Sequence, residues 1–276
     1  MLGHVVFRWF ARSAAFRTLG TLRSDATPTA LQGCLGASAT LVRGIDVLDI
    51  PRLELLIRDF KPLAVINCIG LVKQLGAAQD PLQAIPINAL LPHQLARICA
   101  ITGSRLVHIG TDCVFSGLAG SYREGDLPDP VDLYGRTKLV GEPDASHVVT
   151  LRSSLVGPEL GTRHGLLSWF LNAPGPVKGY ARAVFSGLPT VEVAQVIEQH
   201  ILPNPSLSGI YHLASEPIDK HAFLGLVARE YGIPTRIESD ETVVIDRSLD
   251  ASRFRAATGY TPPAWPELVR RMRAFG

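Results

Sequence analysis

The feature that most constrains the fold is a series of short runs that are apolar throughout rather than at alternate positions. Runs of strand length occur at residues 17–22, 63–70, 106–110, 148–153 and 209–214. Strands buried on both faces have this pattern, and they occur in parallel sheets that helices cover on both sides. Between the runs, apolar residues recur at helical spacing, first at Leu53, Leu56, Ile57 and Phe60 and then at Leu91, Leu95 and Ile98. The alternation predicts an α/β fold with a doubly wound parallel sheet.

The pattern changes after residue 155. Residues 156–187 are rich in Gly and Pro, which favours loops and short elements. A helix near 191–200 and a strand near 209–214 then return to the sheet, and further helices are expected at 222–231 and after Pro266. We therefore predict a Rossmann-type domain over residues 1–155, with its sheet completed by about 188–215. Residues 156–187 and 216–276 form a smaller, discontinuous substrate-binding lobe. The ligand cleft is expected between the two parts, outside the carboxyl ends of the strands.

The first 24 residues allow two interpretations. They contain Arg8, Arg12, Arg17 and Arg23, no acidic residue, and apolar residues at helical spacing. Mitochondrial transit peptides have this composition. We favour the first helix of a nucleotide-binding fold, because residues 21–24 continue directly into a usable strand end.

Composition excludes several classes of function. Net charge is +2 and the Lys and Arg residues are scattered, which argues against nucleic-acid binding. No apolar run reaches the ~18 residues of a membrane span. The four cysteines, at positions 34, 68, 99 and 113, lack metal-ligand spacing, so no metal site is predicted. Unpaired cysteines in apolar runs suit the reducing cytoplasm.

Tyr134 and Lys138 form a Tyr-x-x-x-Lys pair that a helix would place on one face. A nearby ammonium is expected to lower the pKa of the phenol, making Tyr134 a general acid for a carbonyl oxygen that receives a hydride. Thr111, at the end of a predicted strand, supplies a second hydroxyl, and Lys138 would also hold the nicotinamide ribose. The alternative is a half-buried aromatic with a lysine reaching the surface, beside ordinary turn chemistry at residues 111–112.

Further motifs follow one another along nearly the whole chain, at residues 67–70, 88–89, 111–117, 122–124, 134–138, 141–142, 151–154, 186–190 and 249–250. In this order they resemble the extended short-chain dehydrogenase/reductases and, within that superfamily, the dTDP-4-dehydrorhamnose reductase group. The resemblance implies NADPH-dependent reduction of a nucleotide-linked 4-keto-6-deoxy sugar in surface polysaccharide biosynthesis.

The resemblance also implies roles for particular residues. Thr111, Tyr134 and Lys138 match the catalytic triad of the family. The residues that match its cofactor contacts, besides Tyr134 and Lys138, are Gly3, Arg23, Ser24, Asp46, Val47, Asn67, Cys68, Ile69, Gly70, Asn88, Ser153, Ser154 and Leu155. Arg23 follows the strand where a guanidinium pairs with a 2′-phosphate, which favours NADPH over NADH. An ordinary surface arginine is the alternative.

Substrate contacts are expected from the 111–113 turn and from the second lobe. The sugar is expected to face Thr111, Asp112 and Cys113. The nucleotide diphosphate is expected to be bound by Trp169, Lys178 and Arg247. The alternative is a core tryptophan and two solvated cations. Gly110 precedes Thr111 and Cys113 replaces an aromatic of the family, which leaves the rhamnose-pathway substrate open.

The glycine-rich loop of the family has no full counterpart. That loop follows the first strand and reads Gly-x-x-Gly-x-x-Gly, and here only Met1-Leu2-Gly3 fits its last three positions. Gly33, Gly36 and Ala39 have similar spacing, but no strand pattern precedes them, so we interpret this stretch as a loop. We expect the chain to lack about ten residues, the length of one strand and a turn, and with them most pyrophosphate contacts.

Two other functions are compatible with the same motifs. An epimerase or dehydratase on this fold would recycle its nicotinamide, and a regulatory subunit would bind the nucleotide without turnover. The helix pattern around residues 89–101 is compatible with a homodimer, although core packing explains it equally well.

Overall fold

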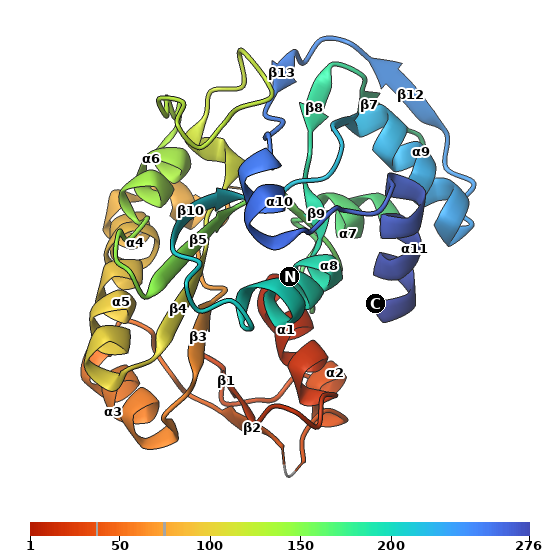
Figure 1. Cartoon of the computed structure of the whole chain (residues 1–276). Helices are drawn as coiled ribbons and strands as arrows, with labels where there is room; N and C mark the ends of the chain where they lie inside the picture. Colours follow the sequence, from red (N-terminus) through yellow and green to blue (C-terminus); the bar gives the residue numbers. More distant parts are fainter. Residues whose placement is uncertain (37, 74–75) are drawn as a thin grey trace.

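The computed structural model describes residues 1–36, 38–73 and 76–276. Parallel strands form the centre and helices lie on both sides of them (Figure 1). The fold class predicted from the sequence is confirmed.

The central sheet has four parallel strands in the order β10–β5–β4–β3. They are β3 (Ala64–Asn67), β4 (Arg105–Ile109), β5 (Val148–Arg152) and β10 (Gly209–His212). Each lies within one residue of an apolar run, and β10 joins the sheet beside β5 as predicted. Because all four run in parallel, their carboxyl ends meet at one edge, which is where a ligand site is expected.

A second parallel pair, β1 (Thr18–Thr21) and β2 (Ala39–Val42), lies on the β3 side of this sheet. β1 occupies the first predicted run. β2 was not predicted, because a four-residue strand with a half-buried, mixed pattern carries little periodic signal. It begins at Ala39, the last residue of the stretch interpreted as a loop, and the one-turn helix α2 (Thr29–Gln32) comes before that stretch.

One face of the sheet is covered by α1 (Leu2–Ala11), α8 (Thr190–Val196) and α11 (Trp265–Phe275). Val107 and Val149 face these helices and share one core cluster with Leu2 and Val193. The helix predicted near residues 191–200 is α8, which continues into a π-helical turn over Ile197–Ile201 (η4). The predicted first helix is α1.

The opposite face is covered by α3 (Ile50–Phe60) and α5 (Leu91–Thr102), whose residues Leu53 and Leu95 pack against Leu106 and Val148. Three short turns precede α5: η1 (Gly76–Gln79), α4 (Pro81–Ala84) and η2, a π-helical turn over Ile85–Leu90. The helix α6 (Leu133–Val140) lies beside η2.

Over residues 155–189 the elements are short, as the Gly and Pro content of 156–187 predicts. β6 (Leu155–Val156) pairs with β9 (Leu188–Pro189), and β7 (Val177–Tyr180) pairs with β12 (Ile237–Asp240). β8 (Ala183–Phe185) lies between β11 (Ile218–Asp219) and β13 (Ile245–Asp246). The helices here are α7 (Leu166–Leu171), α9 (Lys220–Tyr231) and α10 (Ser252–Thr258). The predicted division into two domains stays a prediction.

Across the three described ranges, no helix combines the length and the apolar character that crossing a membrane requires.

Candidate active site

Thr111 begins the turn that follows β4. It caps the 3₁₀ turn Asp112–Val114 (η3): its Oγ1 accepts a hydrogen bond from the Cys113 N–H at 3.2 Å and donates one to the Asp112 carboxylate, also at 3.2 Å. Thr111 and Asp112 are both buried. The hydroxyl is therefore held in one orientation at the carboxyl end of the central sheet.

Gly110, just before this turn, explains one departure from the family motif. A Cβ at this position would lie 3.1 Å from the Arg152 side chain and 3.3 Å from that of Thr150. Arg152 has little room to yield, because its guanidinium forms a buried, two-point ion pair with Glu142 at 2.7–2.8 Å. A glycine suits this packing better than a larger residue.

The helix α6 carries Tyr134 and Lys138 and is fixed at both ends. Asp132 caps its start by accepting from the Gly135 N–H at 2.8 Å. Any side chain at Gly135 would collide with the Cys113 carbonyl, and one at Gly141 would collide with the Asn88 carbonyl. Two glycines thus bring the helix backbone into contact with the Thr111 turn on one side and with η2 on the other.

This packing places the Tyr134 phenol within hydrogen-bonding reach of the Thr111 side chain. Burial raises the pKa of the phenol above its ordinary value, and Cys113 and Asp112 raise it further. The sequence-based expectation of a pKa lowered by Lys138 was therefore wrong for the protein without ligand. Desolvation outweighs the charge, and Tyr134 stays protonated and able to donate.

Lys138 lies beneath the end of β4. The residue is 4% exposed, and its Nζ donates to the Ile109 carbonyl at 2.7 Å. Burial lowers the pKa of Lys138 to about 8, although Glu142 opposes the change. An ammonium has three donors, and this bond is the one hydrogen bond that Nζ makes within the described part of the chain. A Cβ on Gly70 would lie 4.0 Å from Nζ, so the free donors lie near the end of β3.

Two buried asparagines shape that strand end. Asn67 accepts from the Ile69 N–H at 3.1 Å and contacts His108 Nδ1 at 3.1 Å. Asn88, in the π-helical turn η2, accepts from the Leu71 N–H at 2.9 Å and lies 3.4 Å from the Thr137 hydroxyl on α6. The cofactor candidates Asn67 and Asn88 therefore fix the segment 67–71 beside Lys138.

Arg247 reaches the same turn from the far end of the chain. Residues 245–250 run beside the loop 115–122, with hydrogen bonds from the Asp246 N–H to Gly117 and from the Tyr122 N–H to Ser248. Arg247 Nε donates to the Phe115 carbonyl at 2.9 Å. The structure therefore places this substrate candidate next to Asp112 and Cys113, where its charge acts on both.

Sequence reasoning missed two further cations here. Lys220, the first residue of α9, interacts electrostatically with Asp112, Arg247, Cys113 and Lys73. Lys73 also forms an ion pair with Asp132, the cap of α6, at 2.6 Å. Three cations from three separate segments thus lie around the Thr111 turn. No spacing in the sequence connects them, because only the tertiary fold brings these segments together.

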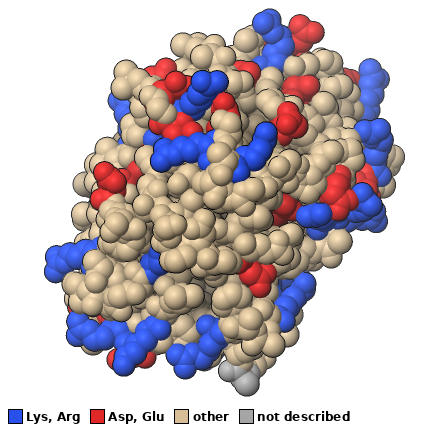
Figure 2. All heavy atoms as spheres, viewed as in Figure 1, with Lys and Arg blue, Asp and Glu red and all other residues tan. Residues whose placement is uncertain are grey.

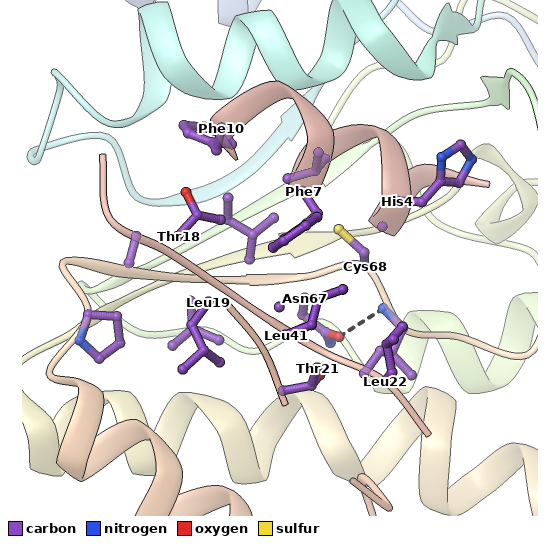
Figure 3. Close-up of a pocket in the computed structure, with 18 of the residues that line it drawn as sticks. His4, Phe7, Phe10, Thr18, Leu19, Thr21, Leu22, Leu41, Asn67 and Cys68 are labelled. Carbon is purple, nitrogen blue, oxygen red and sulfur yellow. Dashed lines mark hydrogen bonds between the residues drawn. The ribbon is translucent and has the colours of Figure 1, made fainter. Parts of the chain in front are cut away.

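The remaining cofactor candidates lie at the same edge of the strands. Arg23 and Ser24 are exposed just after β1, and Asp46, also exposed, follows β2. Val47 is half-buried against α3. Ser153 is buried after β5, and Leu155 pairs with Leu188 in β6–β9. A Cβ added at Gly3 would lie 3.5 Å from the Cβ of Cys68, one of the pocket residues labelled in Figure 3.

Two substrate candidates lie on other elements. Trp169 is on α7 and 42% exposed, and Lys178 is on β7, where Nζ lies 3.0 Å from Asp240. Neither forms a hydrogen bond or ion pair with Thr111, Asp112, Tyr134 or Lys138 in the described ranges. Their role in substrate binding stays a prediction.

On the face that Figure 2 shows, few charged side chains lie at the centre; basic and acidic ones are mixed in the upper half, and most of those along the lower edge are basic. Among residues whose structure is described, no three His, Cys, Asp or Glu side chains gather in a way that could hold a metal ion.

A doubly wound parallel sheet with a Thr-Tyr-Lys group at its carboxyl edge defines the short-chain dehydrogenase/reductase type of α/β protein. The family described as RmlD substrate binding domain matches residues 24–161, half of the chain, and the chain belongs to this family.

Individual relatives agree with this assignment. Methionine adenosyltransferase 2 subunit beta of Xenopus tropicalis is 26% identical over 303 residues, which cover 98% of this chain and 86% of the relative. The probable low-salt glycan biosynthesis reductase Agl14 of Haloferax volcanii is 29% identical over 254 residues, 83% of each chain. The crystal structure of dTDP-4-dehydrorhamnose reductase from Bacillus anthracis in complex with NADP superposes with a TM-score of 0.77 at 19% identity. It covers 96% of this chain and 100% of that one, and at this identity it shows the shared fold.

Proposed function

We propose that this chain is an NADPH-dependent reductase of a nucleotide-linked 4-keto-6-deoxy sugar that serves surface polysaccharide biosynthesis. The observation that carries the proposal is the turn after β4, where the Thr111 hydroxyl is fixed, Tyr134 lies beside it and Lys138 Nζ donates to the Ile109 carbonyl just before it. Membership of the RmlD family supports the same reaction class.

Tyr134, Thr111 and Lys138 have separate roles in the proposed carbonyl reduction. NADPH, when bound, supplies the hydride for the carbonyl carbon. Tyr134 donates its phenolic proton to the carbonyl oxygen, which suits a phenol whose raised pKa keeps it protonated. The Thr111 hydroxyl has a single proton, so it would release its hydrogen bond to Asp112 to donate one to that oxygen. The charge of Lys138 would stabilise the phenolate left behind.

The structure fits a nicotinamide cofactor in two respects. Lys138 Nζ is buried and has donors to spare beside Gly70, which suits the hydroxyls of a ribose. Arg23 is exposed after β1 and forms no ion pair in the described part of the chain, which suits a 2′-phosphate. The NADP in the Bacillus anthracis structure supports the same choice, with NADH as the alternative.

The three cations around the Thr111 turn support a nucleotide-linked substrate. Lys73, Lys220 and Arg247 would face the diphosphate, because charge-assisted hydrogen bonds to phosphate are strong. The name of the Haloferax volcanii relative, a glycan biosynthesis reductase, supports a role in a glycan pathway.

The test is NADPH oxidation with a panel of dTDP- and UDP-linked 4-keto-6-deoxyhexoses. Wild-type turnover that is lost in Tyr134→Phe and kept in Tyr231→Phe supports the reductase. Tyr231 ends α9 beside Arg273 and is none of the candidate site residues, so it is a matched control. Interconversion of sugars without consumption of NADPH would instead support an epimerase or dehydratase.

A second function is favoured by one observation. The relative that covers 98% of this chain is a subunit of methionine adenosyltransferase. A regulatory subunit would bind a partner equally well with Tyr134 or Phe at this position and would oxidise no NADPH. The same pair of variants separates this role from catalysis.

A further inference from the structure

A buried ion pair lies next to the Thr111–Tyr134–Lys138 group, between the end of α6 and the end of β5. Arg152, the last residue of β5, donates to Glu142 from Nε at 2.8 Å and from Nη2 at 2.7 Å. The two side chains are 3% and 4% exposed. Burying two charges costs desolvation free energy, and apolar residues in place of such a pair often leave a fold as stable or more so. Stability therefore gives no sufficient reason for charges at these two positions.

Glu142 is placed where Lys138 could pair with it. It comes four residues after Lys138, and its N–H donates to the Leu139 carbonyl at 3.2 Å, so the helical turn continues to this point. Burial lowers the pKa of Lys138 to about 8, and the charge of Glu142 opposes that change. Lys138 nevertheless donates to the Ile109 carbonyl, and among the residues that the structure describes the ion pair of Glu142 is with Arg152.

Arg152 explains this choice of partner. A guanidinium presents parallel N–H donors that match both oxygens of a carboxylate, whereas an ammonium acts as a point charge. Both Glu142 oxygens are occupied by Arg152, so Lys138 keeps its bond to Ile109 and two further donors. The arrangement leaves the lysine available to a ribose and to the Tyr134 phenolate.

Arg152 is itself held by the residues that follow the Thr111 turn. Its guanidinium carbon lies 5.4 Å from the centre of the Phe115 ring, and that ring stacks on Tyr122 at 4.2 Å. A Cβ on Gly110 would press on the Arg152 side chain at 3.1 Å. The arginine therefore has a fixed position between this turn and Glu142.

The other titratable side chains next to Lys138 and the ion pair are Tyr134 on α6, His108 on β4 and His212 on β10. Burial lowers the pKa of both histidines and raises that of the phenol, so all three are neutral around neutral pH. One step further out, His93 on α5 acts on the first histidine and Glu124 on the second. The balance between Glu142 and Arg152 therefore sets the net charge beside Lys138.

We propose that Arg152 is a positioning residue for Lys138: it binds the Glu142 carboxylate and so keeps the lysine on the Ile109 carbonyl, at the end of β4. Without the guanidinium, Glu142 would be a buried carboxylate without a partner, which is costly. Lys138, one helical turn away, would then move from Ile109 to Glu142. The effect on turnover rests on the proposed function, but the state of Lys138 can be measured without turnover.

Three variants test the proposal: Arg152→Met, Glu142→Gln and the two combined. Each substitution roughly keeps the size of the side chain and removes its charge. The charge of Lys138 is followed across pH by ¹³C NMR of its Cε atom, which needs neither cofactor nor substrate.

The two single variants are expected to shift the titration of Lys138 in opposite directions. In Arg152→Met the unbalanced carboxylate should raise the midpoint by about one pH unit, and a crystal structure should show Nζ bonded to Glu142. In Glu142→Gln the unbalanced guanidinium should lower the midpoint by about one pH unit. The double variant should titrate close to the wild type. A pair that only stabilises the fold would not give shifts of opposite sign.

Turnover should follow the same pattern. kcat/KM at pH 7 should fall about tenfold or more in Arg152→Met, because Lys138 is drawn away from its site, and most of the loss should be recovered in the double variant. Arg271→Met is the matched control. It breaks another ion pair with a buried carboxylate, that of Glu192 at 3.1 Å, and should change neither the titration of Lys138 nor kcat/KM.

An unchanged Lys138 titration in folded Arg152→Met would overturn the proposal, as would shifts of the same sign in both single variants. If Arg152→Met does not fold, the other two variants decide, because a double variant that titrates like Glu142→Gln contradicts a role for Arg152. Opposite shifts in a protein without turnover would support the placement of Lys138 and sink the reductase. Turnover without these shifts would do the reverse.

Discussion

Lys138 donates a hydrogen bond from its buried Nζ to the main-chain carbonyl of Ile109, 2.7 Å away, directly before the turn that holds Thr111. The bond ties α6 to the end of β4 and fixes the lysine below the Tyr134–Thr111 contact. It also keeps the ammonium of Lys138 buried. Because burial desolvates the ammonium, the pKa of Lys138 is lowered to about 8. Two predictions follow from this single placement.

The first concerns the pH dependence of reduction. Tyr134 remains protonated in this range because its pKa is raised, whereas Lys138 loses its proton near pH 8. Since the charge of Lys138 stabilises the developing phenolate, kcat/KM should fall by about tenfold per pH unit above pH 8. The fall should move to higher pH in Lys138→Arg, because the guanidinium keeps its proton over this range. A flat profile to pH 9.5 would contradict the proposed role.

The second concerns stability. Between about pH 8 and 10.5 the unfolded chain binds more protons at this site than the folded chain, so stability rises with pH in that window. Below pH 8 the fold carries the cost of a buried ammonium. Lys138→Met should therefore raise the free energy of unfolding at pH 7 by roughly 1–3 kcal/mol. The loss of the hydrogen bond to Ile109 reduces this gain. Urea unfolding at pH 7 and pH 10 measures the gain, which should shrink at the higher pH.

Gly135 holds α6 against the Thr111 turn. Gly135→Ala would push the added methyl into the Cys113 carbonyl and move Tyr134 away from Thr111. We expect kcat to fall by about a hundredfold and stability by about 2 kcal/mol. Gly125→Ala is the matched control, because its added methyl meets nothing within 4 Å. Unchanged kcat in Gly135→Ala would show that the contact is not needed for turnover.

A substitution of Lys220 tests whether the three cations around the Thr111 turn (Lys73, Lys220 and Arg247) bind the diphosphate of the substrate. Lys220→Met keeps the length of the side chain and removes its charge, so KM for the nucleotide sugar should rise about tenfold or more while kcat changes little. Lys61→Met, at the exposed end of α3, should leave both constants unchanged. A loss of kcat with constant KM would place Lys220 in the chemistry rather than in substrate binding.

Much of this fold could be predicted because its signals are local. The strand runs are apolar throughout since both faces of the sheet are covered, and Tyr134 and Lys138 sit one helical turn apart. β2 was missed because it is only four residues long and its burial does not alternate: one residue is buried, one exposed and two half-buried. The cations Lys73 and Lys220 were missed because segments far apart in the chain meet only in the folded protein.

The pKa of Tyr134 was predicted in the wrong direction for a physical reason. The spacing of Tyr134 and Lys138 suggests a simple charge effect, but a sequence does not show burial. In the structure Lys138 is directed to Ile109, and desolvation of the phenol outweighs its charge.

The measurement that tests the central claim most directly is isotope transfer from NADPH deuterated at C4 of the nicotinamide. It is run with each 4-keto-6-deoxy nucleotide sugar. We expect a reduced sugar that carries one deuterium, formed in step with NADPH oxidation and absent in Tyr134→Phe. Unlabelled sugar from protein that binds NADPH, with no oxidation of the cofactor, would contradict the assignment as a reductase.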